Sequence, residues 1–195
     1  YYKRGVRGEK LYSILSRVLK LVENAVRNGL IDGIGEVGRQ HYTTSPERFV
    51  FSETLMREAM ILARDLRVPL QLHLEQGGFI TVLSVKTLID SLGVSSRQII
   101  LHHTNTETSS WASNYKLPFT APVKYFDKEY LKSGVEYCMI ESDFLDDPRR
   151  PGVSAYPWDI PVIVRNLLVK SVMNEEQAYR ILVDNVVKYM NVKPP

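Results

Sequence analysis

Cysteine is almost absent from this chain of 195 residues, since Cys138 is its only one. An intrachain disulfide is therefore excluded, and the apolar neighbours of Cys138 indicate a packed thiol rather than a reactive one. Long apolar runs are also absent, because none approaches the ~20 residues that a membrane-spanning helix needs. These absences argue against a disulfide-rich or membrane protein, and they suit the reducing cytoplasm, where we expect the protein to act.

Neither sign of charge is in large excess. The 25 Lys and Arg residues against 22 Asp and Glu residues give a net charge of +3, which is too small to indicate nucleic-acid binding from the field of the whole protein. A phosphate-binding glycine loop is missing as well. Residues 33–38 spell G-x-G-x-x-G, but the polar residues that follow do not resemble the start of a helix, so dinucleotide binding is not favoured.

Strands and helices are predicted to alternate along the whole chain. Apolar residues at three- and four-residue spacing, together with capping residues, predict helices over residues 9–28, 52–66, 79–92 and 126–132, near Trp111, and from Trp158 and Asn174. Apolar runs between them predict five strands, at residues 30–38, 68–74, 98–103, 119–123 and 135–140. No repeat or linker marks a second domain, so residues 1–195 are expected to form one domain.

This order of elements predicts a parallel α/β sheet with right-handed crossovers. Two architectures are open at this point. One is an open, doubly wound sheet, and the other is part of a TIM (β/α)8 barrel, which typically needs eight strands and about 250 residues.

Four of the five predicted strands end in side chains that can bind a metal ion, and only the strand at residues 119–123 does not. The strand-end residues are Glu36, His73, the pair His102-His103, and Asp143. Because the carboxyl ends of parallel strands meet at one edge of a sheet, we expect these side chains to lie close together. Carboxylates and imidazoles are the usual ligands of divalent ions in hydrolases. The sequence therefore predicts a site for one or two divalent ions.

Each residue has a simpler explanation when it is taken alone. His73 could be a hydrogen-bonded residue at the rim, Glu36 could pair with Arg39, and Glu141 and Asp143 could cap the next turn. It is much less expected that four strand ends all carry metal-ligating side chains by accident than that one of them does.

The segments around these residues resemble one family. Ile34-Gly35-Glu36-Val37-Gly38, Leu72-His73-Leu74, Leu101-His102-His103 and Ile140-Glu141-Ser142-Asp143 are similar to the Glu, His, His and Asp segments of the TatD-related metal-dependent hydrolases, in the amidohydrolase-like (β/α)8 superfamily. The tail from Asn174 through Asn185 and Tyr189 is similar to the closing helix of that family. The resemblance runs over nearly the whole chain and implies the C-terminal two-thirds of a (β/α)8 barrel.

The resemblance also implies roles for the strand-end residues. Glu36 would be a metal-bridging ligand, His73 and one of His102 or His103 further ligands, and Asp143 a ligand and the base toward the attacking water. Glu36 and Asp143 would thus be the catalytic carboxylates, with one or two Zn, Mn or Mg ions as cofactor. The run at residues 103–108 resembles an archaeal-type branch of the family and favours His103, although His102 aligns almost as well.

The chain also departs from the family pattern. The family begins with a His-x-His pair at the end of its first barrel strand, and this chain has none, so we expect that roughly 60 to 90 residues with the first three strands are absent from it. Glu75 stands where the family often has Arg. We consider Glu75, Asn105, Arg149 and Arg150 as substrate-binding residues, although the two arginines could also belong to a solvated loop.

The function that follows is a metal-dependent hydrolase, most simply a TatD-like deoxyribonuclease that cleaves phosphodiesters. A lactonase or phosphotriesterase-like amidohydrolase is the alternative, and a barrel that has lost its metal and serves as a scaffold is the third. The substrate is expected to be DNA or a small molecule, without a membrane partner, and the sequence does not indicate an oligomeric state. Asp143 is expected to matter more for activity than Glu141.

Overall fold

The computed structural model describes residues 5–6, 8–40 and 42–194. Its one sheet contains five parallel strands: β1 (Ile34–Gly38), β2 (Leu70–His73), β3 (Ile99–His102), β4 (Phe119–Pro122) and β5 (Cys138–Glu141). The strands lie side by side in sequence order, β1-β2-β3-β4-β5. A doubly wound sheet reverses its strand order partway, whereas consecutive strands of a (β/α)8 barrel do not. The doubly wound alternative is therefore wrong. Within the described residues β5 does not pair with β1, so the sheet is open.

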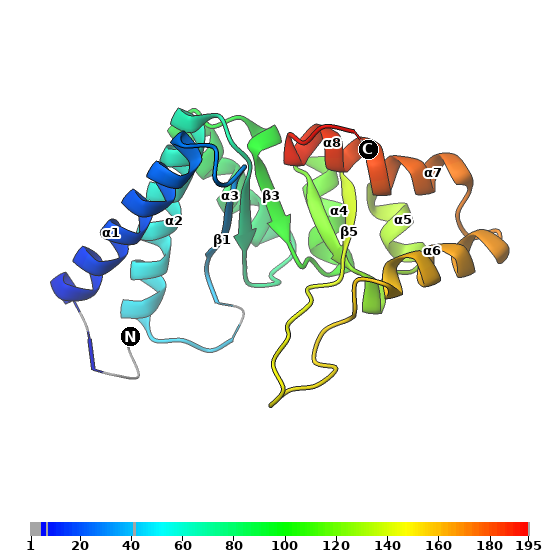
Figure 1. Ribbon diagram of the computed structural model, residues 1–195, viewed down its shortest axis with the longest axis horizontal. Coiled ribbons are helices and arrows are strands. Elements are labelled where there is room, and N and C mark those ends of the chain that lie inside the picture. The colour runs from blue at the N-terminus through cyan, green and yellow to red at the C-terminus, as the bar shows by residue number, and fades with distance from the viewer. Residues whose placement is uncertain (1–4, 7, 41, 195) are drawn as a thin grey trace.

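Eight α-helices are described: α1 (Gly8–Arg27), α2 (Pro46–Leu66), α3 (Phe79–Leu92), α4 (Thr106–Asn114), α5 (Lys128–Gly134), α6 (Asp159–Val169), α7 (Glu175–Tyr179) and α8 (Asn185–Met190). In Figure 1, α1 and α2 lie at one end of the molecule and α6 and α7 at the other, with the sheet between them. A π-helical turn, η4 (Arg180–Asp184), joins α7 to α8. None of the helices in this part of the chain is long and apolar enough to cross a membrane.

The predicted helix boundaries are confirmed where capping chemistry is explicit. Helix α3 ends as predicted, with Gly93 in the left-handed conformation, and the capping box of Asn174 and Gln177 begins α7. The predicted start of α2 after Ser52 is wrong. The hydroxyl of Ser45 accepts a hydrogen bond from the backbone of Arg48, so one continuous helix begins seven residues earlier, at Pro46.

The two faces of the sheet have different coverings because strand side chains alternate. On one face, Leu70, Leu72, Ile99 and Leu101 pack with residues of α2 and α3 in the main hydrophobic core. On the other face, Ile100 and Met139 form a smaller cluster with Tyr189 of α8. His102 and Glu141 lie two residues further along the same strands. Helix α8 therefore covers the amino ends of this face, and ionisable groups occupy its carboxyl ends.

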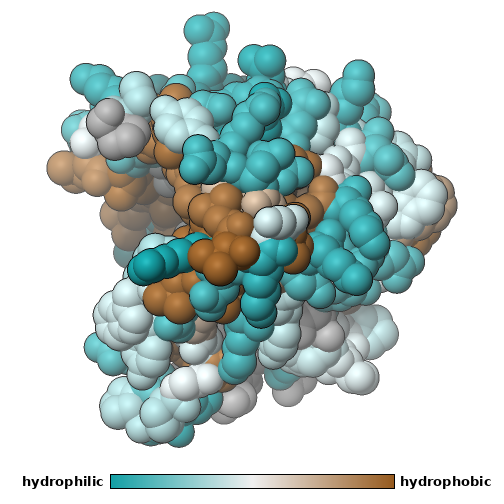
Figure 2. All heavy atoms as spheres, turned by 90° about the vertical axis from the view of Figure 1, so that its right-hand side faces the viewer, coloured by the Kyte–Doolittle hydropathy of each residue, from teal (hydrophilic) through white to brown (hydrophobic). Residues whose placement is uncertain are grey.

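Apolar side chains also reach the surface at the end of the molecule that carries α6 and α7. Figure 2 faces this end and shows hydrophobic residues gathered in the middle of it, with hydrophilic residues around them. The exposed apolar residues of α6 and the turn that follows it include Val162, Val169 and Val172. Apolar side chains of α6 and of the turn after it are thus left exposed in the part of the chain that the structure describes.

Asn185 fixes α8 to the sheet and gives a test of this packing. Its buried Nδ2 atom donates to the carbonyl oxygens of Val135 at 2.7 Å and Cys138 at 2.6 Å. Asn185→Ala leaves both carbonyls without this donor and should lower the free energy of unfolding by about 1–3 kcal/mol. The exposed Asn166 of α6 supplies the control, since Asn166→Ala should change stability by less than about 0.5 kcal/mol. Equal urea midpoints for the two variants would contradict the assignment.

Candidate metal centre

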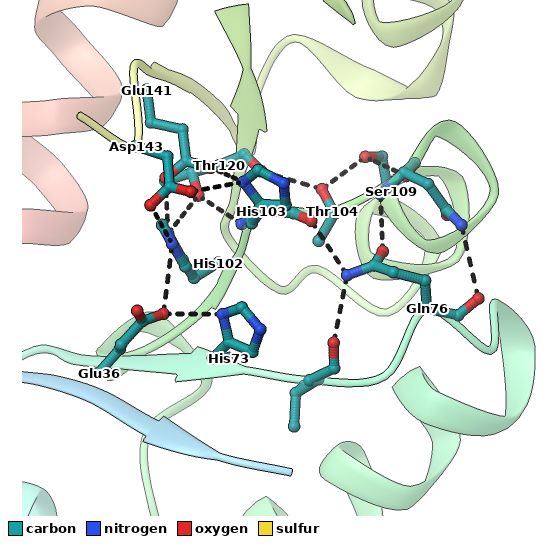
Figure 3. Close-up of polar contacts among 12 residues, drawn as sticks. Glu36, His73, Gln76, His102, His103, Thr104, Ser109, Thr120, Glu141 and Asp143 are labelled. Carbon is teal, nitrogen blue, oxygen red and sulfur yellow. Dashed lines mark hydrogen bonds and ion pairs between the residues drawn. The ribbon is translucent and has the colours of Figure 1, made fainter. Parts of the chain in front are cut away.

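The carboxyl ends of four strands bring together every strand-end residue that the sequence singles out. Glu36 lies in β1, His73 ends β2, and His102 ends β3, with His103 directly after it. Asp143 follows β5 by two residues. The parallel register pairs His73 with His102, which sets their rings at centroids 5.8 Å apart. Figure 3 shows these side chains converging above the ends of the strands.

Glu36 lies between two of the histidines. Its Oε2 atom is 2.9 Å from Nδ1 of His73 and 3.3 Å from Nε2 of His102. One ligating atom from each of these three residues lies within 4.8 Å of the others. The alternative that Glu36 pairs with Arg39 is wrong, because the guanidinium of Arg39 contacts other carboxylates.

A second group of ligating atoms shares His102. Its Nδ1 atom lies 2.6 Å from Oε2 of Glu141, and Nδ1 of His103 lies 3.1 Å from Oε1 of the same carboxylate. Asp143 completes the arrangement, with Oδ1 3.5 Å from Nε2 of His102 and Oδ2 3.6 Å from Nδ1 of His103. His102 therefore contacts Glu141 with one ring nitrogen and faces Glu36 and Asp143 with the other.

The contact with His102 gives Glu141 a larger part in the site than the sequence predicts. Strand β5 ends at Glu141, and Asp143 then adopts a φ of 48°, so the carboxylates of both residues reach the histidines. The side chain of Glu141 is only 12% exposed. When the Nδ1–H group of His102 donates to Glu141, the lone pair of Nε2 faces Glu36 and Asp143, as a metal ligand requires.

The charges of the cluster shift the ionisation of its members. The hydrogen bond from His73 lowers the pKa of Glu36 despite partial burial. Burial opposes protonation of His102, but Glu141, Glu36 and Asp143 together outweigh it and raise the pKa of His102. The hydrogen bond to Glu141 raises the pKa of His103 as well. Burial also opposes ionisation of Glu141, yet its two histidine partners lower its pKa to about 2.

Two polar residues support this site without being apparent as candidates in the sequence. The hydroxyl of Thr120 in β4, which is 2% exposed, accepts a hydrogen bond from the backbone of His103 at 3.0 Å. The Nε2 atom of Gln76 donates to the carbonyl of His103 at 3.0 Å, and its Oε1 atom accepts from the backbone of Asn105 at 2.8 Å. A polar residue in the otherwise apolar strand β4 was the available signal for Thr120.

Arg39 joins the ends of the two strands that carry Glu36 and His73. It is 3% exposed, and its Nε and Nη2 atoms each donate to Glu75 at 2.8 Å. Its Nη1 atom donates to Glu53 of α2 and to Ser84 of α3, both at 3.0 Å. Both oxygens of Glu75 thus accept from Arg39, which gives Glu75 a structural contact, and its expected role in substrate binding stays a prediction.

The other three candidate substrate residues have different surroundings. Asn105 caps α4, with its Oδ1 atom accepting from the backbone of Thr108 at 2.8 Å. The side chains of Arg149 and Arg150 pair with Asp147 at 3.0 and 3.1 Å and are 87% and 58% exposed. Of these residues, Arg150 lines a cavity of about 540 Å³ that also borders Glu36 and Asp143.

The donor set fits a divalent ion. Two imidazoles and two carboxylates converge from separate strands, a mixture that suits zinc, manganese or a similar ion. Two groups of residues could hold it, Glu36 with His73 and His102, or His102 with His103 and Glu141, and Asp143 lies beside both. Ligating imidazoles must be neutral, so the raised pKa of His102 predicts that protons compete with the metal and that affinity falls as pH is lowered.

Comparison with known proteins supports this fit. A family model described as "TatD related DNase" matches residues 6–191. An uncharacterized protein of Methanocaldococcus jannaschii is 27% identical over 178 residues, which are 91% of this chain and 62% of that protein. The chain therefore spans less than two thirds of the length of that relative.

Solved structures share the fold. A TatD homologue from Escherichia coli K12 is similar with a TM-score of 0.67 and 16% identity, over 90% of this chain and 70% of that one. An organophosphorus hydrolase from Deinococcus radiodurans has the same TM-score and identity, over 90% and 62%. A TatD-like protein from Archaeoglobus fulgidus has a TM-score of 0.61 and 18% identity, over 91% and 66%. These likenesses place β1–β5 among the strands of (β/α)8 proteins.

The contact between Glu141 and His102 can be tested by metal binding. Glu141→Gln keeps the shape of the side chain but removes the charge that orients the imidazole, and it should weaken metal binding about 10- to 100-fold. Glu136→Gln makes the same change on an exposed side chain near the other end of β5 and should leave the affinity unchanged. Titration of the metal-free proteins with Zn²⁺ against a chelating dye measures both. Equal affinities would show that Glu141 does not position His102.

Proposed function

We propose, from the premise that the chain belongs to the family of TatD-related DNases, that it is a metal-dependent hydrolase that cleaves phosphodiesters, with DNA as the expected substrate. The observation that carries this proposal is the convergence of Glu36, His73, His102 and Asp143 at the carboxyl edge of one parallel sheet. Such an edge is where catalytic groups lie in (β/α)8 enzymes.

Within this site, His102 is a better candidate ligand than His103. Its Nε2 atom faces Glu36 and Asp143, and its other nitrogen is held by Glu141. The Nδ1 atom of His103 is directed at Oε1 of Glu141 at 3.1 Å and is farther, at 3.6 Å, from Asp143. We therefore propose Glu36, His73, His102 and Asp143 as ligands and His103 as a neighbour that helps to fix Glu141, which changes the preference for His103 that the sequence suggests.

A divalent ion held by these residues would supply Lewis acidity, which lowers the pKa of water from about 15.7 toward 7. Asp143 is suited to handle the proton that the water loses, because its side chain is 45% exposed and borders the cavity. One of its carboxylate oxygens can accept that proton and later pass it to the leaving oxygen. Glu36, whose pKa the hydrogen bond from His73 lowers, supplies a second negative charge beside Nε2 of His102.

Hydrolysis of neutral esters is the second candidate function. The observation that favours it is the structural likeness to the organophosphorus hydrolase, which equals the likeness to the TatD homologue. Both likenesses concern the fold, so they do not separate the two activities. A protein without metal or activity is the third hypothesis, and the convergence of the candidate ligands Glu36, His73, His102 and Asp143 favours an enzyme over it.

A substrate screen tests the proposal directly. Purified protein is supplied with Zn²⁺, Mn²⁺ or Mg²⁺ and offered single-stranded DNA, bis(p-nitrophenyl) phosphate, lactones and phosphotriesters. We expect about one or two ions per chain by elemental analysis, hydrolysis of the phosphodiesters, and loss of this activity after chelation. Hydrolysis of lactones alone would support the second candidate, and a site that stays empty after soaking with metal would support the scaffold.

Asp143 gives the sharpest single-residue test. Asp143→Asn keeps the shape but removes the anion, so turnover should fall by about 10²- to 10⁴-fold. The melting temperature should change by no more than a few degrees, since Asp143 is exposed beyond the end of β5. Asp146→Asn in the same loop is the control and should retain activity. If Asp143→Asn kept full activity, or if it unfolded, the assignment of Asp143 as a catalytic carboxylate would be wrong.

A further inference from the structure

Among the five described strands, only β4 has a carboxyl end without a candidate metal ligand. A cationic side chain, Lys124, follows it closely. Lys124 lies in the 3-10 turn η3 (Val123–Tyr125), two residues beyond the end of β4 at Pro122. Its neighbours along the edge are the ligand-bearing ends of β3 and β5. Lys124 thus occupies the same edge as the metal centre.

The cavity beside the metal centre joins these groups. It has a volume of about 540 Å³, and its walls include Glu36 and Asp143 as well as Lys124 and Arg150. A group bound in this cavity would lie against the carboxylate that we propose as the base and against positive charge at the same time.

The two cations differ in how much of their charge is available. The Nε atom of Arg150 is 3.1 Å from Asp147, a carboxylate whose pKa its arginine partners lower to about 2. The Nζ atom of Lys124 donates to the carbonyl oxygen of Gly152 at 3.3 Å. Among the described residues no carboxylate forms a salt bridge with Lys124. The charge of Lys124 is therefore not neutralised by an ion pair. The contact with Gly152 holds the side chain near the loop that lines the cavity.

Charge also separates the substrate classes that this fold can serve. A phosphodiester carries one negative charge next to the bond that breaks, whereas a lactone or a phosphotriester is neutral there. The carboxylates beside the cavity repel an anion, and the charge of a bound divalent ion and of nearby cations offsets that repulsion. A cation in the cavity therefore favours the anionic class specifically.

We propose that the cavity is an anion-binding subsite in which Lys124 determines specificity for substrates with a negatively charged phosphate at the reacting bond. This inference rests on the proposed function and deepens it, because it gives a reason within the site for the choice of phosphodiesters over neutral esters. Lys124 contacts the substrate phosphate and has no part in holding the metal.

Two substrates with the same leaving group isolate the effect of charge. Bis(p-nitrophenyl) phosphate is an anionic diester, and diethyl p-nitrophenyl phosphate is a neutral triester. Lys124→Met should lower kcat/KM for the diester by about 10- to 100-fold, the effect of a lost hydrogen bond to a charged group. The value for the triester should stay within about twofold, and Lys124→Arg should recover most of the activity on the diester.

The matched control is Lys128→Met. Lys128 is an exposed lysine at the start of α5, four residues further along the chain and outside the cavity, so its loss should change neither substrate. Melting temperatures of all variants establish that the fold is kept. An equal loss on diester and triester, or no loss on the diester, would overturn the proposal.

Phosphate binding supplies a readout that does not need turnover. Calorimetry of the metal-loaded proteins with inorganic phosphate should give a dissociation constant about 10-fold higher for Lys124→Met than for the wild type and for Lys128→Met. Identical constants would overturn the subsite. If the wild type cleaves only neutral esters, the proposed function fails. A phosphate affinity that depends on Lys124 would still support the subsite in that case, so the two failures are distinguishable.

Discussion

The arrangement of the site depends on the contact between Glu141 and His102. Glu141 is the last residue of β5 and His102 the last of β3, and β4 separates the two strands in the sheet. The contact of 2.6 Å therefore spans a strand, and the hydroxyl of Thr120 on that strand lies 3.3 Å from Nδ1 of His102. By fixing one nitrogen of His102, Glu141 directs the other toward Glu36 and Asp143. The orientation of the candidate ligand His102 thus depends on the last residue of β5.

A second contact of this kind holds the other half of the site. Arg39 binds Glu75 with two hydrogen bonds and also reaches α2 and α3, so the ends of β1 and β2 are joined below the surface. Gly38 allows these ends to approach, since a Cβ atom there would lie 2.0 Å from the carbonyl oxygen of His73. Burial opposes the charge of Arg39, but Glu75 and Glu53 outweigh it and raise its pKa, so the guanidinium stays protonated. The guanidinium of Arg39 thus has three side-chain partners, the carboxylates of Glu75 and Glu53 and the hydroxyl of Ser84.

The sequence predicts the strands and the ionisable residues at their ends well because both follow local rules. Apolar runs define β2, β3 and β5, and ionisable residues at their ends stand out against those runs. The roles of Glu75 and Glu141 could not be predicted in the same way. Both depend on which side chains meet across the sheet, and Arg39, 36 positions before Glu75, carries no mark of that pairing. The choice between His102 and His103 likewise depends on the backbone at the end of β3, where His103 turns to a φ of 57°.

The position of α8 has a consequence for how the protein is made. Asn185 and Tyr189 bind the carbonyl oxygens of Val135, Cys138 and Glu136, at the amino end of β5 and just before it. These contacts join residues 47 to 53 positions apart, and they can form only after the C-terminal helix has left the ribosome. Strand β5, with Glu141 at its end and Asp143 beyond it, is therefore secured only after α8 has been synthesised. The position of the two carboxylates at and beyond the end of β5 thus depends on a helix that binds the opposite end of that strand.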